Sequence, residues 1–136
     1  MRKIYIATHG DFSKGLKHSL QMIVGNMAED IQTYSLYPGE SSTDFAKKLD
    51  SEIKKNIENE YVILGDLFGA SVVNSLIEIA EYDNVVLFSG VNLNLALEVV
   101  LSQAARLTDP IIEEMLQSAR LGIMRIKAVE LEDEEF

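Results

Sequence analysis

Short apolar runs alternate along this chain with longer segments of helical periodicity, and this alternation constrains the fold most. Four runs predict strands, at residues 4–7, 31–36, 61–64 and 85–88. Between them, apolar residues recur every three or four positions, which predicts helices. Strands that alternate with helices form βαβ units. We therefore predict an α/β fold, a doubly wound and mostly parallel sheet of four strands in the order 2-1-3-4 with helices on both faces.

The first three helices have recognisable starts or apolar stripes. The first is expected to run from Asp11 or Phe12 to Val24. The second is expected to begin at a serine cap, Ser41 or Ser42. Its buried stripe is expected to consist of Phe45, Leu49, Ile53 and Ile57. The stripe of the third helix is expected to consist of Val72, Val73, Leu76, Ile77 and Ala80.

Two further helices and a last strand follow. The fourth helix is expected to run from Asn92 or Leu93 to Leu107. Asp109 as N-cap and Pro110 as the first helical residue predict a fifth helix, which Gly122 closes. Apolar and basic residues then alternate over residues 124–128, which predicts a C-terminal antiparallel edge strand with one polar face.

Composition narrows the class of protein. A chain of 136 residues with 47% hydrophobic and 25% charged residues is expected to form a single soluble domain, residues 1–136. No apolar run approaches the ~20 residues of a membrane span, and we expect no signal peptide. A net charge of −10 argues against nucleic acid as a partner, and the acidic tail at 130–135 is expected to aid solubility. The absence of Cys excludes disulfides and thiolate nucleophiles and fits a reducing compartment.

Unusual polar residues follow the first and third predicted strands. His9 lies in the turn after the first strand, and Asp66 follows the third. Neighbouring parallel strands place such turns at the topological switch point, where ligands bind. A carboxylate bonded to one imidazole N–H fixes the tautomer and leaves the other nitrogen free as a nucleophile. No metal site is indicated, because neither Cys nor a second nearby His is present.

The turns around these two residues predict an anion site. Gly69 and Ser71 precede the third helix and offer backbone N–H groups and a hydroxyl for a phosphoryl group. Thr8 and Gly10 flank the histidine and are candidate phosphate ligands. Each polar residue also has a purely structural interpretation as a helix cap, and for His9 a bond to a neighbouring carbonyl. Patterns for acyl transfer (GxSxG) and nucleotide binding (GxGxxG or a Walker motif) are absent.

Three strand ends together carry a family resemblance. THG after the first strand, DLFGAS after the third and SGVNLNLALE after the fourth resemble the IIA component (EIIA) of the mannose-type sugar phosphotransferase system. The resemblance covers essentially the whole chain. Leu67, Ala70 and Val72 depart from it, since some members carry Thr, Gly and Pro there.

The resemblance implies a phosphoryl relay without a cofactor. His9 would accept a phosphoryl group from HPr as tele-phosphohistidine and pass it to the IIB component (EIIB), with the membrane components IIC and IID coupling transfer to sugar uptake. Asp66 would orient His9, and Ser71 would lie beside the phosphoryl group. The protein would be cytoplasmic, peripheral to the membrane through the transporter complex, and a homodimer that exchanges its C-terminal strand, residues 122–131.

Two alternative functions stay open at this point. One is the related phosphotransfer subunit of a dihydroxyacetone kinase, which shares the histidine chemistry but has a different acceptor. The other is a non-transporting regulatory module, since similar domains occur inside transcriptional activators. The chain has no predicted DNA-binding helix pair and no ATPase motif, which disfavours the second.

Overall fold

The computed structural model describes residues 1–128 and shows strands and helices in alternation. In chain order the elements are β1 (Arg2–His9), α1 (Phe12–Val24), η1 (Gly25–Ala28), β2 (Gln32–Leu36), α2 (Thr43–Lys55), β3 (Glu60–Gly65), α3 (Ser71–Leu76), η2 (Ile79–Glu81), β4 (Val85–Phe88), α4 (Leu93–Leu101) and α5 (Asp109–Leu121). Here η marks short 3₁₀ helices. Among the described helices, none has the length and apolar character needed to cross a membrane.

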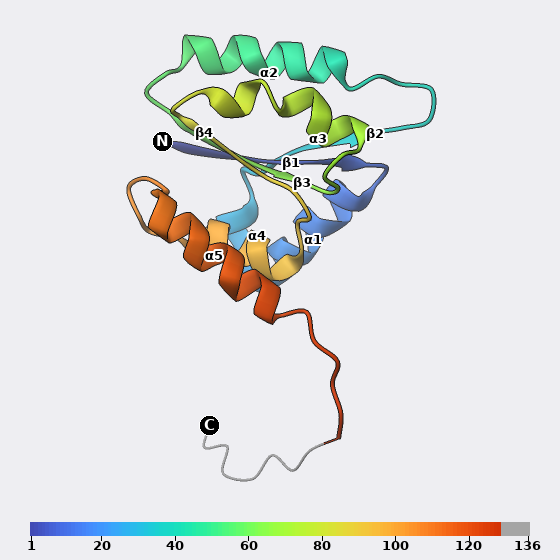
Figure 1. Ribbon diagram of the computed structural model, residues 1–136, viewed down its shortest axis with the longest axis vertical. Helices are drawn as coiled ribbons and strands as arrows, with labels where there is room; N and C mark the ends of the chain where they lie inside the picture. The colour runs from blue at the N-terminus through green and yellow to red at the C-terminus, as the bar shows by residue number, and fades with distance from the viewer. Residues whose placement is uncertain (129–136) are drawn as a thin grey trace.

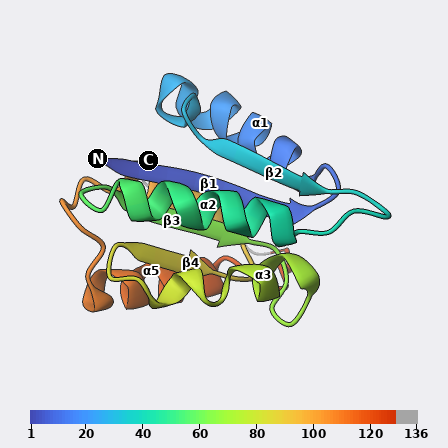
Figure 2. The same cartoon turned by 90° about the horizontal axis from the view of Figure 1, so that it is seen from above.

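The sheet has the predicted topology. Its four strands are parallel and lie in the order β2-β1-β3-β4. Helices α2 and α3 cover one face, and α1, α4 and α5 cover the other (Figure 1; Figure 2 gives the view from above). This confirms the predicted doubly wound α/β architecture. The carboxyl ends of β1 and β3 lie side by side, because Ala7 pairs with Gly65.

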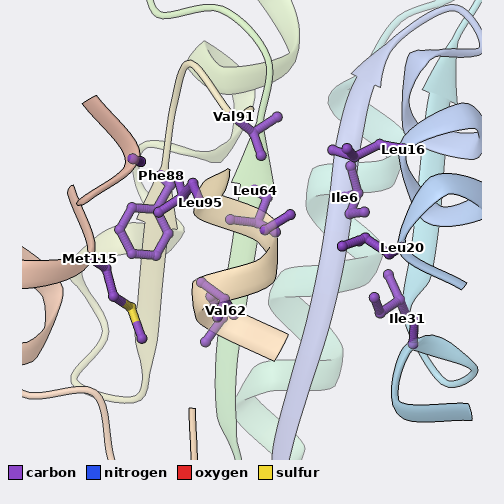
Figure 3. Packing of buried hydrophobic residues seen from close by; sticks show 14 of the residues in the cluster. Ile6, Leu16, Leu20, Ile31, Val62, Leu64, Phe88, Val91, Leu95 and Met115 are labelled. Carbon is purple, nitrogen blue, oxygen red and sulfur yellow. The ribbon is translucent and has the colours of Figure 1, made fainter. Parts of the chain in front are cut away.

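Two apolar cores sit on opposite faces of the sheet, and strand periodicity divides the residues between them. Ile6, Val62 and Leu64 face α1, α4 and α5 (Figure 3). Their chain neighbours Tyr61 and Ile63 face α2 and α3. All six residues of β3 are buried, as the continuous apolar run predicted for a central strand.

Helix ends are where the structure departs from the expectations. Ile57 is 76% exposed and Ile77 is 44% exposed, because α2 ends at Lys55 and α3 at Leu76. The chain tightens into η2, which buries Ile79 instead. The N-cap of α5 is one residue earlier than predicted, at Thr108.

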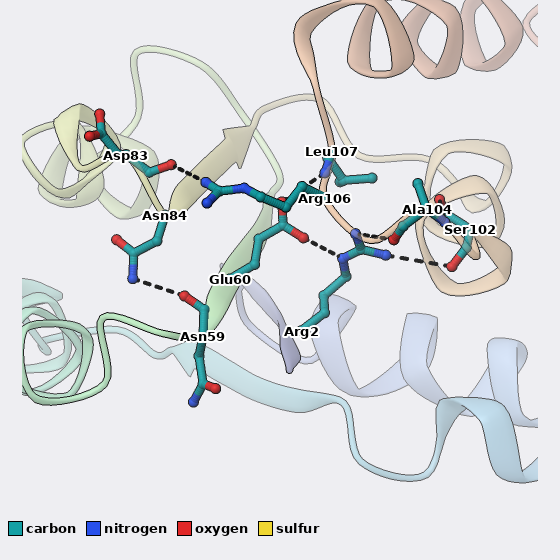
Figure 4. Close-up of polar contacts among 9 residues, drawn as sticks. All are labelled: Arg2, Asn59, Glu60, Asp83, Asn84, Ser102, Ala104, Arg106 and Leu107. Carbon is teal, nitrogen blue, oxygen red and sulfur yellow. Dashed lines mark hydrogen bonds and ion pairs between the residues drawn. The ribbon is translucent and has the colours of Figure 1, made fainter.

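The fourth helix is shorter than predicted because tertiary hydrogen bonds take up the backbone that follows it. It ends at Leu101 rather than Leu107. The Arg2 guanidinium donates to the carbonyls of Ser102 and Ala104 (Figure 4). Glu60 accepts from Arg2 Nε at 2.6 Å and from the Leu107 N–H at 2.8 Å. These bonds hold the α4–α5 connection against the amino ends of β1 and β3.

The C-terminal segment does not form the predicted strand within this single chain. Residues 123–128 carry no regular secondary structure and extend away from the end of α5 (Figure 1). Three large apolar side chains are exposed there, Ile123, Met124 and Ile126. A strand that needs a partner edge gains no hydrogen bonds in an isolated chain, so the predicted strand exchange stays a prediction. The acidic tail and the end of the predicted exchange segment lie outside the described residues.

Candidate functional site

The structure brings His9 and Asp66 together at the carboxyl ends of β1 and β3. His9 Nδ1 lies 2.9 Å from Asp66 Oδ2, and the backbone N–H of His9 donates to the same oxygen at 2.8 Å. One bond fixes the backbone of His9 and the other fixes the orientation of its imidazole ring. The carboxylate side chain is 13% exposed and the imidazole is 45% exposed, so the ring is fixed yet accessible from solvent.

The charge on Asp66 defines the tautomer of His9. Partial burial raises the pKa of Asp66. The hydrogen bonds from the His9 backbone and ring, together with the electrostatic attraction of the ring, lower the pKa by more, so the net pKa lies below the ordinary value. Asp66 is therefore ionised at neutral pH and can only accept hydrogen bonds. The proton of a neutral His9 ring must then sit on Nδ1, which leaves the Nε2 lone pair free.

Ser71 faces the free nitrogen. It is the first residue of α3, and its Oγ lies 3.4 Å from His9 Nε2. Helix α3 can approach this closely because Gly65 ends β3. A Cβ at Gly65 would lie 2.5 Å from Val73 Cγ2 and 3.2 Å from the Phe88 carbonyl oxygen. The site thus consists of an oriented imidazole, a carboxylate behind it and a hydroxyl in front.

Thr8 is placed on the other face of the sheet from His9, since successive strand residues alternate. Its side chain is fully buried, and Oγ1 accepts from the Ser13 N–H at 2.8 Å in the first turn of α1. The Thr8 hydroxyl therefore holds the first turn of α1 against the end of β1 and does not point towards His9 Nε2. The N-cap residue Asp11 makes no side-chain cap bond of its own.

The two glycines predicted as phosphate ligands differ in their surroundings. The N–H of Gly10 already donates to the Leu36 carbonyl at 2.7 Å, and Gly10 has φ +55°, so its role is to shape the turn. Gly69, at φ +88°, lies in the exposed turn before α3. Helix α3 has only six residues, so it supplies less than a full helix dipole, and side chains must do more of the anion binding.

Ser42 has a role that the residues around it do not reveal. Of the two serines predicted as caps for α2, Ser41 and Ser42, it is the N-cap residue, but its side chain makes no cap bond. Its Oγ instead donates to the backbone carbonyl of Ser71, 29 residues away. A serine before a helix gives no sequence signal for a contact of this kind. The other histidine, His18, is exposed on α1.

Comparisons with known proteins support one assignment. A family model, EIIA-man, described as the PTS system fructose IIA component, matches residues 3–116. The chain belongs to this family. It is accordingly a phosphoryl-transfer component of a sugar phosphotransferase system, as the resemblance of its three strand ends indicated.

Individual relatives cover nearly the whole EIIA chain. A sorbose-specific EIIA component from Klebsiella pneumoniae is 26% identical over 129 residues, 94% of each chain. The crystal structure of an EIIA from Streptococcus agalactiae is 30% identical and superposes with a TM-score of 0.78, covering 92% of this chain and 97% of that one. A mannose/sorbose-specific IIA subunit from Enterococcus faecalis shares the fold, with a TM-score of 0.81 at 24% identity over 96% and 98% of the two chains.

Proposed function

We propose that His9 is the phosphoryl acceptor of this EIIA chain, taking the group from phosphorylated HPr and passing it to the IIB component. The observation that carries the proposal is the 2.9 Å bond between His9 Nδ1 and the Asp66 carboxylate, which leaves Nε2 as the nucleophile. The membrane components IIC and IID would then couple the transfer to sugar uptake. The protein would act in the cytoplasm and reach the membrane through this complex.

The chemistry requires little beyond positioning and charge balance. The His9 Nε2 lone pair attacks phosphorus, the N–P bond forms as the P–N bond to the donor histidine breaks, and the donor ring keeps the released electron pair. The His9 ring then carries positive charge, because Nδ1 retains its proton. Asp66 stabilises that charge at hydrogen-bond distance, and no cofactor or metal is part of this step.

Ser71 and the turn before α3 are the proposed phosphoryl ligands. The Ser71 hydroxyl lies on the Nε2 side of the ring, and the exposed Gly69 turn offers a backbone N–H nearby in the chain. Thr8 and Gly10 act indirectly, by fixing the turn that carries His9. An incoming phosphoryl group is anionic, so hydroxyl and N–H donors offset its repulsion from Asp66.

The chain offers a matched pair of variants, because it contains two histidines. Incubation with labelled phospho-HPr should give an acid-labile phosphohistidine on the wild type and on His18→Gln, and none on His9→Gln. Label that persists in His9→Gln, or that disappears in His18→Gln, would overturn the assignment of His9. His18→Gln should keep the wild-type free energy of unfolding, since that side chain is exposed, whereas His9→Gln removes the ring partner of Asp66 and should lower it slightly.

The acceptor and the oligomer are tested separately. Phosphorylated chain should discharge to a mannose-type IIB component and not to a dihydroxyacetone kinase, and the opposite preference would make it a kinase subunit. The apolar side chains of residues 123–126 are exposed in the single chain, which supports a homodimer that covers them. Truncation after Gly122 should convert the dimer into a monomer in sedimentation measurements, and a truncated chain that stays dimeric would contradict this interface.

A further inference from the structure

Helix α3 has little of its own to hold its first turn in place. It has six residues, and its N-cap is Ala70, which has no side chain that could cap it. Ser, Val and Asn make up most of the helix, and none is a strong helix former. Yet Ser71, its first residue, must keep its hydroxyl 3.4 Å from His9 Nε2.

Ser42, at the start of the neighbouring helix α2, makes a hydrogen bond that holds the first turn of α3 in place. Its side chain is 4% exposed, and its Oγ donates to the Ser71 carbonyl at 3.1 Å. The same Oγ contacts Ser75 Oγ, and Ser75 Oγ donates to the Ser71 carbonyl at 2.8 Å. The three groups form a closed triangle. Two hydroxyl protons serve its three edges, so two full hydrogen bonds exist at any moment.

This contact is made at the expense of a local one. A serine at an N-cap ordinarily accepts from an N–H of its own helix, and Ser42 does not. Its buried hydroxyl is instead satisfied by the first turn of α3. The link joins the start of α2 to the backbone of the residue whose side chain faces the histidine.

We propose that Ser42 is a positioning residue for the phosphoryl-transfer site, acting on His9 only through Ser71. It does not touch the reacting atoms. By holding the Ser71 carbonyl, it fixes the Cα–Cβ bond that aims the Ser71 hydroxyl at Nε2. Displacements of a fraction of an ångström matter in such sites. The inference rests on the proposed function of His9 and goes beyond it by adding a residue remote from the chemistry.

A double-mutant cycle tests this coupling, with the rate of transfer from saturating phospho-HPr as its readout. Ser71→Ala should slow transfer about tenfold, and Ser42→Ala about fivefold, close to the loss of one hydrogen bond. The double variant should be no slower than Ser71→Ala alone, because Ser42 has no other route to the site. The matched control is Ser41→Ala, whose exposed hydroxyl bonds only to Thr43 among the described residues and should transfer at the wild-type rate.

A second readout needs no partner protein and separates this inference from the proposed function. The ¹⁵N chemical shift of His9 Nε2 reports the hydrogen bond from Ser71 and should move in the same direction in Ser42→Ala and Ser71→Ala. If phospho-HPr does not label the wild type but the Nε2 shift moves as expected in Ser42→Ala and Ser71→Ala, the proposed function is overturned and the positioning role stands. An unchanged Nε2 shift in a folded Ser42→Ala, or losses that multiply in the double variant, would overturn the positioning role. Should Ser42→Ala not fold, Ser75→Ala removes two sides of the triangle and leaves the bond from Ser42 to the Ser71 carbonyl, so it must move the Nε2 shift in the same direction as Ser71→Ala but by less.

Discussion

The two ends of β3 each carry a carboxylate bonded to β1, and they are built for different purposes. At the amino end, Glu60 uses one oxygen for Arg2 and the other for the Leu107 N–H. At the carboxyl end, Asp66 takes both bonds from His9 on Oδ2, and its Oδ1 has no hydrogen-bond partner within residues 1–128. The same strand pair thus carries a carboxylate with both oxygens bonded at one end and a carboxylate with one unbonded oxygen at the other.

Exposure of the partner side chain follows the same division. The Arg2 side chain is 15% exposed and the guanidinium also binds two carbonyls, so it has little freedom. The His9 ring is 45% exposed, and its Nε2 is the nitrogen that we propose accepts the phosphoryl group. A carboxylate whose partner is fully occupied stabilises the fold, whereas one whose partner has a free nucleophilic atom prepares a reaction. Three variants and one pH series separate these two uses.

The largest effect is expected from Asp66→Asn. The amide can still accept from Nδ1–H, but it has no negative charge to balance the imidazolium that forms on transfer. Transfer from phospho-HPr should slow about 100-fold in single-turnover measurements. The free energy of unfolding of Asp66→Asn, measured in urea at neutral pH, should be only slightly below that of wild type. If Asp66→Asn is destabilised but transfers the phosphoryl group at the wild-type rate, the carboxylate at the carboxyl end of β3 has a structural role like that of Glu60 at the amino end.

Glu60→Ala is expected to show the opposite pattern. It leaves Arg2 without its ion-pair partner and the buried Leu107 N–H without an acceptor, which should lower the free energy of unfolding by about 3 kcal/mol. The transfer rate of the folded fraction should equal that of wild type. Glu58→Ala removes an exposed carboxylate two residues away and should be nearly neutral in the same denaturation experiment. A Glu60→Ala chain with wild-type stability would contradict the structural role.

Gly65→Ala should couple stability and transfer, because it lies between the sheet and the helix that carries Ser71. The added methyl group meets Val73 Cγ2, so α3 must move outward. We expect a loss of about 2 kcal/mol in unfolding free energy together with slower transfer. Gly15→Ala, on α1, has open space for a Cβ and should stabilise the chain slightly. Loss of stability without loss of transfer would show that α3 does not position the site.

The smallest effect is a pH dependence of stability. The native pKa of Asp66 lies below the ordinary value, so this group contributes stability above pH ~3.9 that is lost as pH falls through its native pKa. The difference in unfolding free energy between wild type and Asp66→Asn should therefore shrink on acidification from pH 6 to pH 3. A difference that stays constant would mean that the hydrogen bonds from His9 to Asp66 add nothing to folding.

The positions of the four sheet strands and the proximity of His9 to Asp66 are predictable because each depends on local pattern. The run from Tyr61 to Leu64 indicated a buried strand, and the polar residues after it, with His9 after its neighbour, indicated a site at the shared edge. The unpredictable features depend on distant residues. Arg2 binds the carbonyls of Ser102 and Ala104, after which the chain no longer continues α4. The Ser42 side chain binds the Ser71 carbonyl and not the N–H groups of its own helix. Neither contact has a signature in the sequence around it.

The most direct test of the account is to identify the phosphorylated atom. NMR of the chain after reaction with phospho-HPr distinguishes Nε2-phosphohistidine from Nδ1-phosphohistidine. Because Asp66 holds Nδ1 and Ser71 faces Nε2, we expect phosphorus on His9 Nε2. Phosphorus on His9 Nδ1, on the Ser71 hydroxyl or on His18 would contradict it.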